Sequence, residues 1–157
     1  MISLFLRNLF FTILQPGMVA GFIPYYILGD KWRNGVSQKF LFHHYAGIIL
    51  FVIGIMITVS CIVSFAVKGR GTLSPLDPTK KLVISGLYRY SRNPMYVGVM
   101  LILIGEAIFF QSSTLVTYLC WVFIAFNIFI FVHEEPRLRK AFGSAYNDYC
   151  RKVRRWL

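Results

Sequence analysis

The stretch PMYVGVMLILIGEAIFFQSSTLVTYLCWVFIAFNIFIFV, residues 94–132, contains two long apolar runs that are separated only by the uncharged turn Gln111-Ser112-Ser113. A hydrocarbon core about 30 Å thick needs about 20 helical residues at about 1.5 Å each. The runs 94–110 and 114–132 therefore predict an antiparallel hairpin of two membrane-spanning helices. Glu106 lies about one turn from the outer end of the first run, so we expect its side chain to reach the interface.

Two further apolar segments, residues 8–28 and 45–67, precede this hairpin. The second is long enough to cross a bilayer, whereas Gln15-Pro16-Gly17 and Pro24 interrupt the first. Proline removes a backbone donor, so we expect a kinked or broken helix there. A cleaved signal peptide is the alternative, but no clear small-x-small cleavage site follows. The sequence thus predicts an all-α fold, a polytopic membrane bundle of about four transmembrane helices.

The composition supports this fold class and excludes others. Of 157 residues, 57% are hydrophobic and 15% are charged, and the formal net charge is +11. A soluble domain is about half apolar and about a quarter charged. The three cysteines are widely spaced, match neither a disulfide framework nor a zinc motif, and predict no metal site. We interpret residues 1–157 as one membrane domain that binds no nucleic acid.

The basic residues predict the orientation of the spans. With both termini in the cytoplasm, 14 of the 17 Lys and Arg residues lie inside, and only Lys31, Arg33 and Lys39 lie outside. Cytoplasmic connections carry an excess of Lys and Arg, so the distribution favours a multi-pass, N-in and C-in arrangement. The residues before position 94 and those after position 132 then share the cytoplasmic side.

A polar cluster, SGLYRYSRNPMYVG, occupies residues 85–98. Asn93 is a good N-cap and Pro94 suits a first helical turn, so a helix should begin there. Its N-terminus, with Arg92 alongside, is a site for a carboxylate or phosphate, and Tyr96 lies one turn inward. The alternative is a capped helix whose Tyr and Arg side chains are only interfacial anchors.

A second polar cluster, His133-Glu134-Glu135-Pro136-Arg137, follows the last apolar run. Two carboxylates at a helix C-terminus repel each other and the helix dipole, so they require a cation, either a nearby arginine or a ligand. We expect Pro136 to end or redirect the helix, and residues 138–149 to form a basic, amphipathic interfacial helix on the cytoplasmic side. Because both clusters lie on one membrane face, together they suit a zwitterionic ligand.

At these residues the sequence resembles the superfamily of isoprenylcysteine carboxyl methyltransferases and phospholipid methyltransferases. The shared motifs are Gly86-Leu87-Tyr88, the stretch from Arg92 to Gly98, the pair Glu134-Glu135 and FGSAYNDY at residues 142–149. The resemblance covers about residues 75–157, which we interpret as the cofactor-binding half. Residues 1–74 carry the first spans and no comparable motif.

The resemblance implies an integral membrane enzyme that binds S-adenosyl-L-methionine in a cytoplasm-facing pocket and releases S-adenosyl-L-homocysteine. It implies a lipid or another apolar small molecule as the acceptor, with membrane lipids as the surroundings. By the family pattern, the cofactor-binding residues are Lys81, Leu82, Val83, Tyr88, Arg92, Asn93, Pro94, Met95, Tyr96, Gly98 and Glu134.

The acceptor chemistry stays open among a carboxylate, a thiol and a lipid amine. Methyl transfer from a sulfonium is an in-line displacement that needs alignment and exclusion of water. An amine must also lose a proton, and Glu135 is the candidate base. Asn93 replaces the family's usual histidine, and Ile130 stands where the isoprenylcysteine enzymes carry a substrate-binding arginine, which argues against assuming a prenylated cysteine.

Two other functions compete with methyl transfer. Membrane sterol reductases resemble this superfamily in their C-terminal half but use a nicotinamide cofactor, for which this chain offers few phosphate-binding residues. A non-enzymatic transporter or membrane subunit would use the polar clusters as interfacial anchors or as an ion path. The oligomeric state and the identity of the acceptor are not encoded in any pattern of this sequence.

Overall fold

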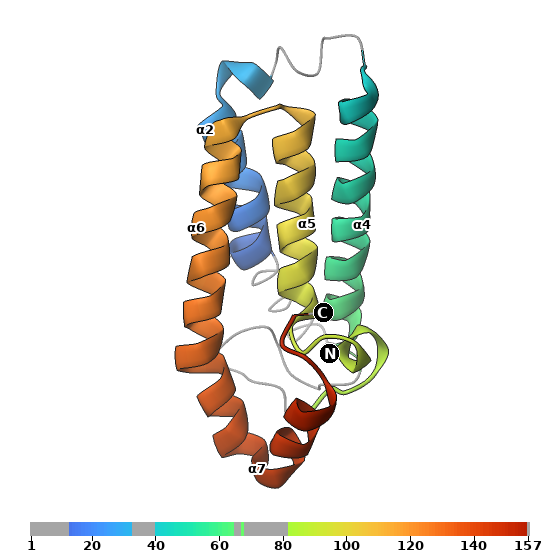
Figure 1. Cartoon of the computed structure of the whole chain (residues 1–157), viewed down its shortest axis with the longest axis vertical. Coiled ribbons are helices and arrows are strands. Elements are labelled where there is room, and N and C mark those ends of the chain that lie inside the picture. The colour runs from blue at the N-terminus through green and yellow to red at the C-terminus, as the bar shows by residue number, and fades with distance from the viewer. Residues whose placement is uncertain (1–12, 33–39, 65–66, 68–81, 157) are drawn as a thin grey trace.

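The computed structural model describes residues 13–32, 40–64, 67 and 82–156 (Figure 1). Within these ranges the secondary structure is helical, apart from an isolated bridge between Ser91 and Arg154. The predicted all-α class is therefore confirmed. In chain order the elements are η1 (Ile13–Phe22), α2 (Ile23–Leu28), α4 (Phe42–Ser64), η3 (Gly86–Arg89), α5 (Pro94–Phe109), α6 (Ser113–Phe129), η4 (Ile130–Glu134) and α7 (Glu135–Lys152).

The helices form an upright bundle in which α5 stands between α4 and α6, with η1 and α2 alongside (Figure 1). Among the described residues, two helical stretches are long and apolar enough to cross a membrane: α4 and the continuous run Ser113–Lys152. Pro16–Leu28 and α5 are shorter apolar helices. The predicted turn at residues 111–113 is present, because the Ser112 hydroxyl caps α6 by accepting from the Leu115 N–H.

Large apolar side chains cover the outside of the bundle. On α4, Ile49 and Met56 are more than half exposed, and on α6 Trp121 is 66% exposed. Exposed apolar surface on this scale marks contact with a membrane or another apolar partner rather than with water. The exterior thus agrees with the membrane character predicted from the composition.

The contact between α4 and α5 is a seam of glycines. Gly47 and Gly54 are seven residues apart on α4, and Gly98 and Gly105 are seven residues apart on α5. A Cβ atom on Gly54 would lie 2.7 Å from the Gly98 carbonyl oxygen, and one on Gly47 would lie 2.7 Å from the Gly105 carbonyl oxygen. Because glycine has no side chain, the two helix backbones can come into contact, and small residues commonly allow such close packing between membrane helices.

The first apolar segment is interrupted by wide helical turns. Residues 13–22 form a π-helix that contains Pro16, and α2 follows with Pro24 in its first turn. Within the described residues, the predicted kink or break takes the form of a change from π-helix to α-helix after Phe22. Residues 8–12 of the predicted segment lie outside the described residues. The π turns leave carbonyls without regular partners, and the Val19 carbonyl accepts a hydrogen bond from the Tyr118 hydroxyl at 2.9 Å.

The prediction that Pro136 ends or redirects the helix is wrong. A π turn, η4, precedes α7, and the Glu135 N–H donates to the Ile130 carbonyl. This places Pro136 in the first turn of α7, where its missing N–H costs little. The chain instead turns at Gly143, whose φ of 55° and ψ of −127° suit glycine alone. The last residues therefore return to the beginning of α5 (Figure 1).

The prediction that the Glu106 side chain reaches the interface is also wrong. Glu106 is only 8% exposed, and its Oε2 atom has no hydrogen-bond partner among the described residues. The same end of α5 packs through Ala107 against Leu28 of α2 and Leu115 of α6, so the helices close over it.

Candidate functional site

The residues before α5 fold against α4 and α7. Gly86 adopts a φ of 66° and opens the 3₁₀ turn η3, which buries Tyr88 against Cys61 and Val83. The Tyr149 hydroxyl of α7 donates to the Tyr88 carbonyl at 2.7 Å. Burial raises the pKa of the Tyr88 hydroxyl well above its ordinary value, so this group stays protonated and able to donate.

Helix α5 begins at Pro94 as predicted, but the predicted side-chain cap is absent. The Asn93 amide donates instead to the Arg155 carbonyl at 3.0 Å, and the Asn93 N–H donates to the Ser91 hydroxyl oxygen. The first N–H groups of a helix have no partner within the helix. In α5, Pro94 has no N–H, and the described residues offer no acceptor to the N–H groups of Met95 and Tyr96.

Tyr96 and Glu134 join the two polar clusters. The Tyr96 hydroxyl donates to Glu134 Oε2 at 2.9 Å, and the Tyr96 ring packs on Phe126 with ring centroids 4.6 Å apart. Glu134 follows the apolar run that ends at Val132. Desolvation raises the pKa of the Glu134 carboxyl above its ordinary value, and the Tyr96 hydrogen bond and the charge of Arg137 oppose that shift. The predicted convergence of the clusters is present.

The adjacent Glu135 has different partners. It is 6% exposed, and its carboxylate accepts from Arg92 Nη1 at 3.2 Å and from Arg155 Nε and Nη2 at 2.9 and 3.1 Å. These charge-assisted hydrogen bonds engage both carboxylate oxygens, so the Glu135 side chain is held in place by its arginine partners. The Arg92 side chain, expected beside an anionic ligand, is likewise engaged by Glu135 and by Cys150 Sγ.

Residues 153–156, which we call the C-terminal tail, complete this network. The Arg92 N–H donates to the Arg154 carbonyl at 2.9 Å. The Trp156 indole N–H donates to Asn127 Oδ1 at 3.2 Å, and its ring packs on Phe123. The sequence predicted no contact for these residues. The spacing of Glu135 from Arg155 gives no local signal of this contact, because it depends on the turn at Gly143.

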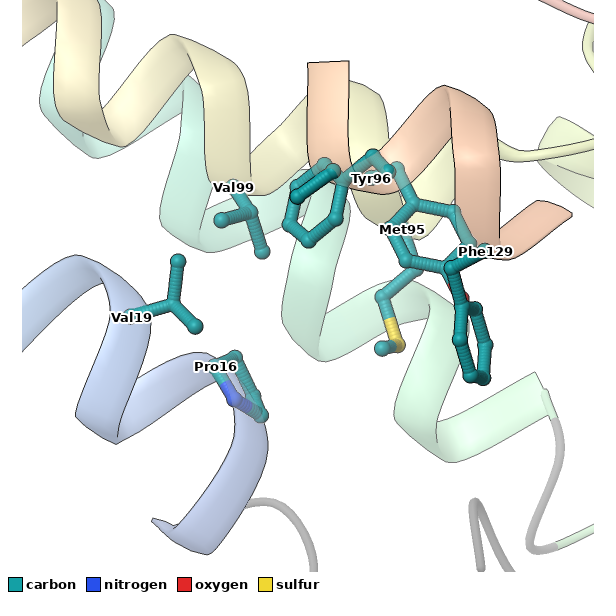
Figure 2. A pocket seen from close by; sticks show the side chains of 8 residues that line it. Pro16, Val19, Met95, Tyr96, Val99 and Phe129 are labelled. Atoms are coloured by element: carbon teal, nitrogen blue, oxygen red, sulfur yellow. The ribbon is translucent and has the colours of Figure 1, made fainter. Parts of the chain in front are cut away.

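An apolar cavity of about 470 Å³ adjoins Tyr96. Side chains from three helices surround one shared space, and Val19 of η1 faces Val99 of α5 across it (Figure 2). The lining residues are Pro16, Val19, Met95, Tyr96, Val99, Ala125, Phe126 and Phe129. Sequence reasoning missed this cavity, whose only early signal is the proline-interrupted first segment.

Most of the site residues predicted from the sequence meet at this end of the bundle. Met95 links the two halves, because it lines the cavity and also packs on the cluster of Cys61, Val83 and Tyr88. Gly98 faces away, since its missing Cβ allows contact with Thr58 of α4. Leu82 is partly buried beside Val83, and Lys81 lies outside the described residues.

A bundle with an apolar exterior, a buried polar cluster and an adjoining apolar cavity defines a helical membrane protein that suits a ligand with polar and apolar parts. The family model for phospholipid methyltransferases matches residues 42–145, which include α4, α5, α6 and both polar clusters. The chain therefore belongs to the phospholipid methyltransferase family, and the resemblance noted in the sequence is confirmed.

Individual proteins similar to this chain are also methyltransferases by name. A probable protein-S-isoprenylcysteine O-methyltransferase from Oryza sativa subsp. indica is 28% identical over 123 residues, which cover 74% of this chain and 61% of the relative. The protein-S-isoprenylcysteine O-methyltransferase of Schizosaccharomyces pombe is 35% identical over 75 residues, 46% of this chain and 30% of the relative. The chain thus matches less than two thirds of the length of either relative.

Proposed function

We propose that the protein is a membrane-embedded, S-adenosylmethionine-dependent methyltransferase with an apolar acceptor. The observation that carries the proposal is the hydrogen bond between Tyr96 and Glu134, which unites the family's two motifs beside an apolar cavity. Family membership supports the reaction type. The relatives named as isoprenylcysteine O-methyltransferases support methyl transfer in general.

The residues at the polar end fit the chemistry of this cofactor. The cationic groups of the cofactor suit the Glu134 carboxylate. Its carboxylate suits the backbone amides of Met95 and Tyr96 at the positive end of α5, to which the described residues offer no acceptor. Tyr88, Leu82, Val83 and, outside the described residues, Lys81 complete the proposed site. Arg92, Asn93 and Pro94 shape it through the tail and the start of α5.

The bound cofactor supplies a methyl group already activated by a sulfonium. The protein then has to orient the acceptor, exclude water and manage any proton of the acceptor. Tyr96 and Phe126 form a rigid apolar wall at the reacting end, and Glu134 is held at that wall. The expectation that Glu135 is a general base remains a prediction, and its ion pairs with Arg92, Arg139 and Arg155 favour a positioning role.

We also propose that the bundle crosses the membrane four times, with both termini and the polar cluster on the cytoplasmic side. The segment containing η1 and α2, α4, α5 and α6 would be the spans, and α7 would be the amphipathic helix at the inner surface. The apolar exterior of the helices and the exposed arginines 137, 139 and 151 of α7 support this arrangement.

The test is transfer of labelled methyl from S-adenosylmethionine by the purified full-length protein into a lipid extract, followed by identification of the product. We expect a labelled apolar product with the wild type and a large loss of label with Glu134→Gln. No transfer, together with binding of NADPH in preference to S-adenosylhomocysteine, would overturn the proposal in favour of a reductase.

A further inference from the structure

The cavity between η1, α5 and α6 differs from the polar cluster in its chemistry. Its lining side chains are apolar except for the Tyr96 hydroxyl, and that hydroxyl is directed to Glu134. The volume of about 470 Å³ falls within the range of small-molecule sites, about 300–1,000 Å³. No charged side chain lines it within the described part of the chain.

We propose that this cavity holds the methyl acceptor, and that the acceptor is a neutral thiol on a hydrocarbon group. The inference rests on the proposed methyltransferase function and names the substrate class of that site. The hydrocarbon would pack among Val19, Val99 and Phe129, with the thiol beside Tyr96.

Charge separates the thiol from the other acceptors. At pH 7 a carboxylic acid is an anion and an aliphatic amine is a cation, whereas a thiol is mostly neutral, since its pKa is about 8.5 in cysteine and higher in a simple alkyl thiol. Transfer of an unpaired charge into an apolar site costs many kcal/mol, and the described lining residues offer no cation to bind a carboxylate. A neutral thiol enters without that cost, and its sulfur becomes a strong nucleophile when its proton leaves during the transfer.

Tyr96 and Glu134 supply a route for the thiol proton. The thiol donates to the Tyr96 hydroxyl oxygen, whose own proton is already directed to Glu134 at 2.9 Å. As the new sulfur–methyl bond forms, the bond between the methyl group and the sulfonium sulfur breaks, and its electron pair stays on the sulfur of the donor. The donor thereby loses one positive charge, and Glu134 gains one proton, which later passes to water. The local charge is the same before and after the step.

The test compares four acceptors of one chain length: octanethiol, octanoate, octylamine and octylphenol. The full-length protein in lipid nanodiscs receives each with labelled S-adenosylmethionine. We expect octyl methyl sulfide as the main product, formed at least about tenfold faster than any other. Faster methylation of octanoate, octylamine or octylphenol would overturn the inference.

Binding of S-adenosylhomocysteine distinguishes the two proposals. If the wild type binds S-adenosylhomocysteine but methylates none of the four acceptors, the proposed cofactor site stands and the inferred substrate class is overturned. Wild type that does not bind it would contradict the proposed function itself.

Substitutions that fill the cavity test whether the acceptor binds there. Val99→Phe, or Ala125→Phe in its place, should raise the KM for octanethiol about tenfold and leave the affinity for S-adenosylmethionine unchanged. The matched control is Val116→Phe on α6, because Val116 is 48% exposed and does not line the cavity. Equal KM values in folded Val99→Phe and Val116→Phe proteins would contradict the location.

Removing the hydroxyl tests the proton route. Tyr96→Phe, at saturating cofactor, should lower kcat near neutral pH and recover as the pH rises, because the thiol then ionises unaided. A merely structural role for Tyr96 would lower the rate equally at every pH, and that result would overturn the route.

Discussion

The two sides of α5 are built in opposite ways. Toward α4, Gly98 and Gly105 bring the helix backbones into contact, so this side is closed and rigid. Toward η1 and α6, Val99 and Tyr96 face a cavity of about 470 Å³. One helix therefore serves both stability and binding. The residues on each side decide whether the neighbouring helix packs directly against α5 or leaves a cavity beside it.

The closed side supports the open one. Tyr96 is only two residues from Gly98, so any slip of α5 along α4 would displace the Tyr96 hydroxyl from Glu134. A seam of backbone contacts allows little sliding, and a binding site placed on such a rigid element keeps its geometry.

The largest expected effect comes from breaking the closed side. A methyl group on Gly54 would lie 2.7 Å from the Gly98 carbonyl and from Ile102, so Gly54→Ala should lower the free energy of unfolding by about 3 kcal/mol. Gly21→Ala is the control, because among the described residues a Cβ atom there would meet no atom within 4 Å apart from its chain neighbours and its own helix backbone. Thermal unfolding in detergent checks both, and equal stability of the two variants would contradict the seam.

A smaller loss of stability is expected at the two glutamates, and it should be unequal. Glu135→Gln removes the charge that holds Arg92 and Arg155 and should cost about 2 kcal/mol, less than a fully buried pair because the Arg155 side chain is 34% exposed. Glu134→Gln keeps a hydrogen-bond acceptor for Tyr96 and should cost less. Greater destabilisation by Glu134→Gln in the same unfolding assay would reverse this assignment.

The tail provides a third test. Asn93→Ala removes the hydrogen bond from the amide to the Arg155 carbonyl and should weaken tail docking by about 1 kcal/mol. Hydrogen exchange at residues 153–156 measures this directly, with the exposed Asn147→Ala as a control. Unchanged protection of the tail in Asn93→Ala would show that this bond contributes nothing.

The smallest expected effect is a pH dependence at the open side. Because desolvation raises the pKa of Glu134, this carboxyl protonates at a higher pH than free glutamate, and its attraction for a sulfonium is lost as the pH falls through that pKa. The affinity for S-adenosylmethionine should then fall relative to that for S-adenosylhomocysteine by about 0.5–1 kcal/mol. The ratio should be independent of pH in Glu134→Gln, and a wild-type ratio that stays constant would contradict the role.

The beginnings and ends of the helices were largely predictable from the sequence. Hydrophobic length and the turn at residues 111–113 place α5 and α6 within one residue of their observed starts, because burial of apolar residues dominates there. The meeting of the polar clusters followed from topology alone.

The features that depend on contacts distant in the sequence were not predictable. Pro136 ends a helix only in regular α geometry, and a π turn removed that constraint. Asn93 was expected to cap α5, yet the returning tail offers its amide a better partner in the Arg155 carbonyl. Gly98 matched a family motif, and its heptad spacing from Gly105 was the overlooked signal of a packing role.

The most direct test is a calorimetric titration of S-adenosylmethionine into the full-length protein, its Glu134→Gln and Tyr96→Phe variants, and Val116→Phe as the control. We expect saturable binding by the wild type and the control, and at least about tenfold weaker binding by Glu134→Gln, with Tyr96→Phe between them. Equal affinity in all four proteins, or no binding to the wild type, would contradict a methyl-donor site built on Tyr96 and Glu134.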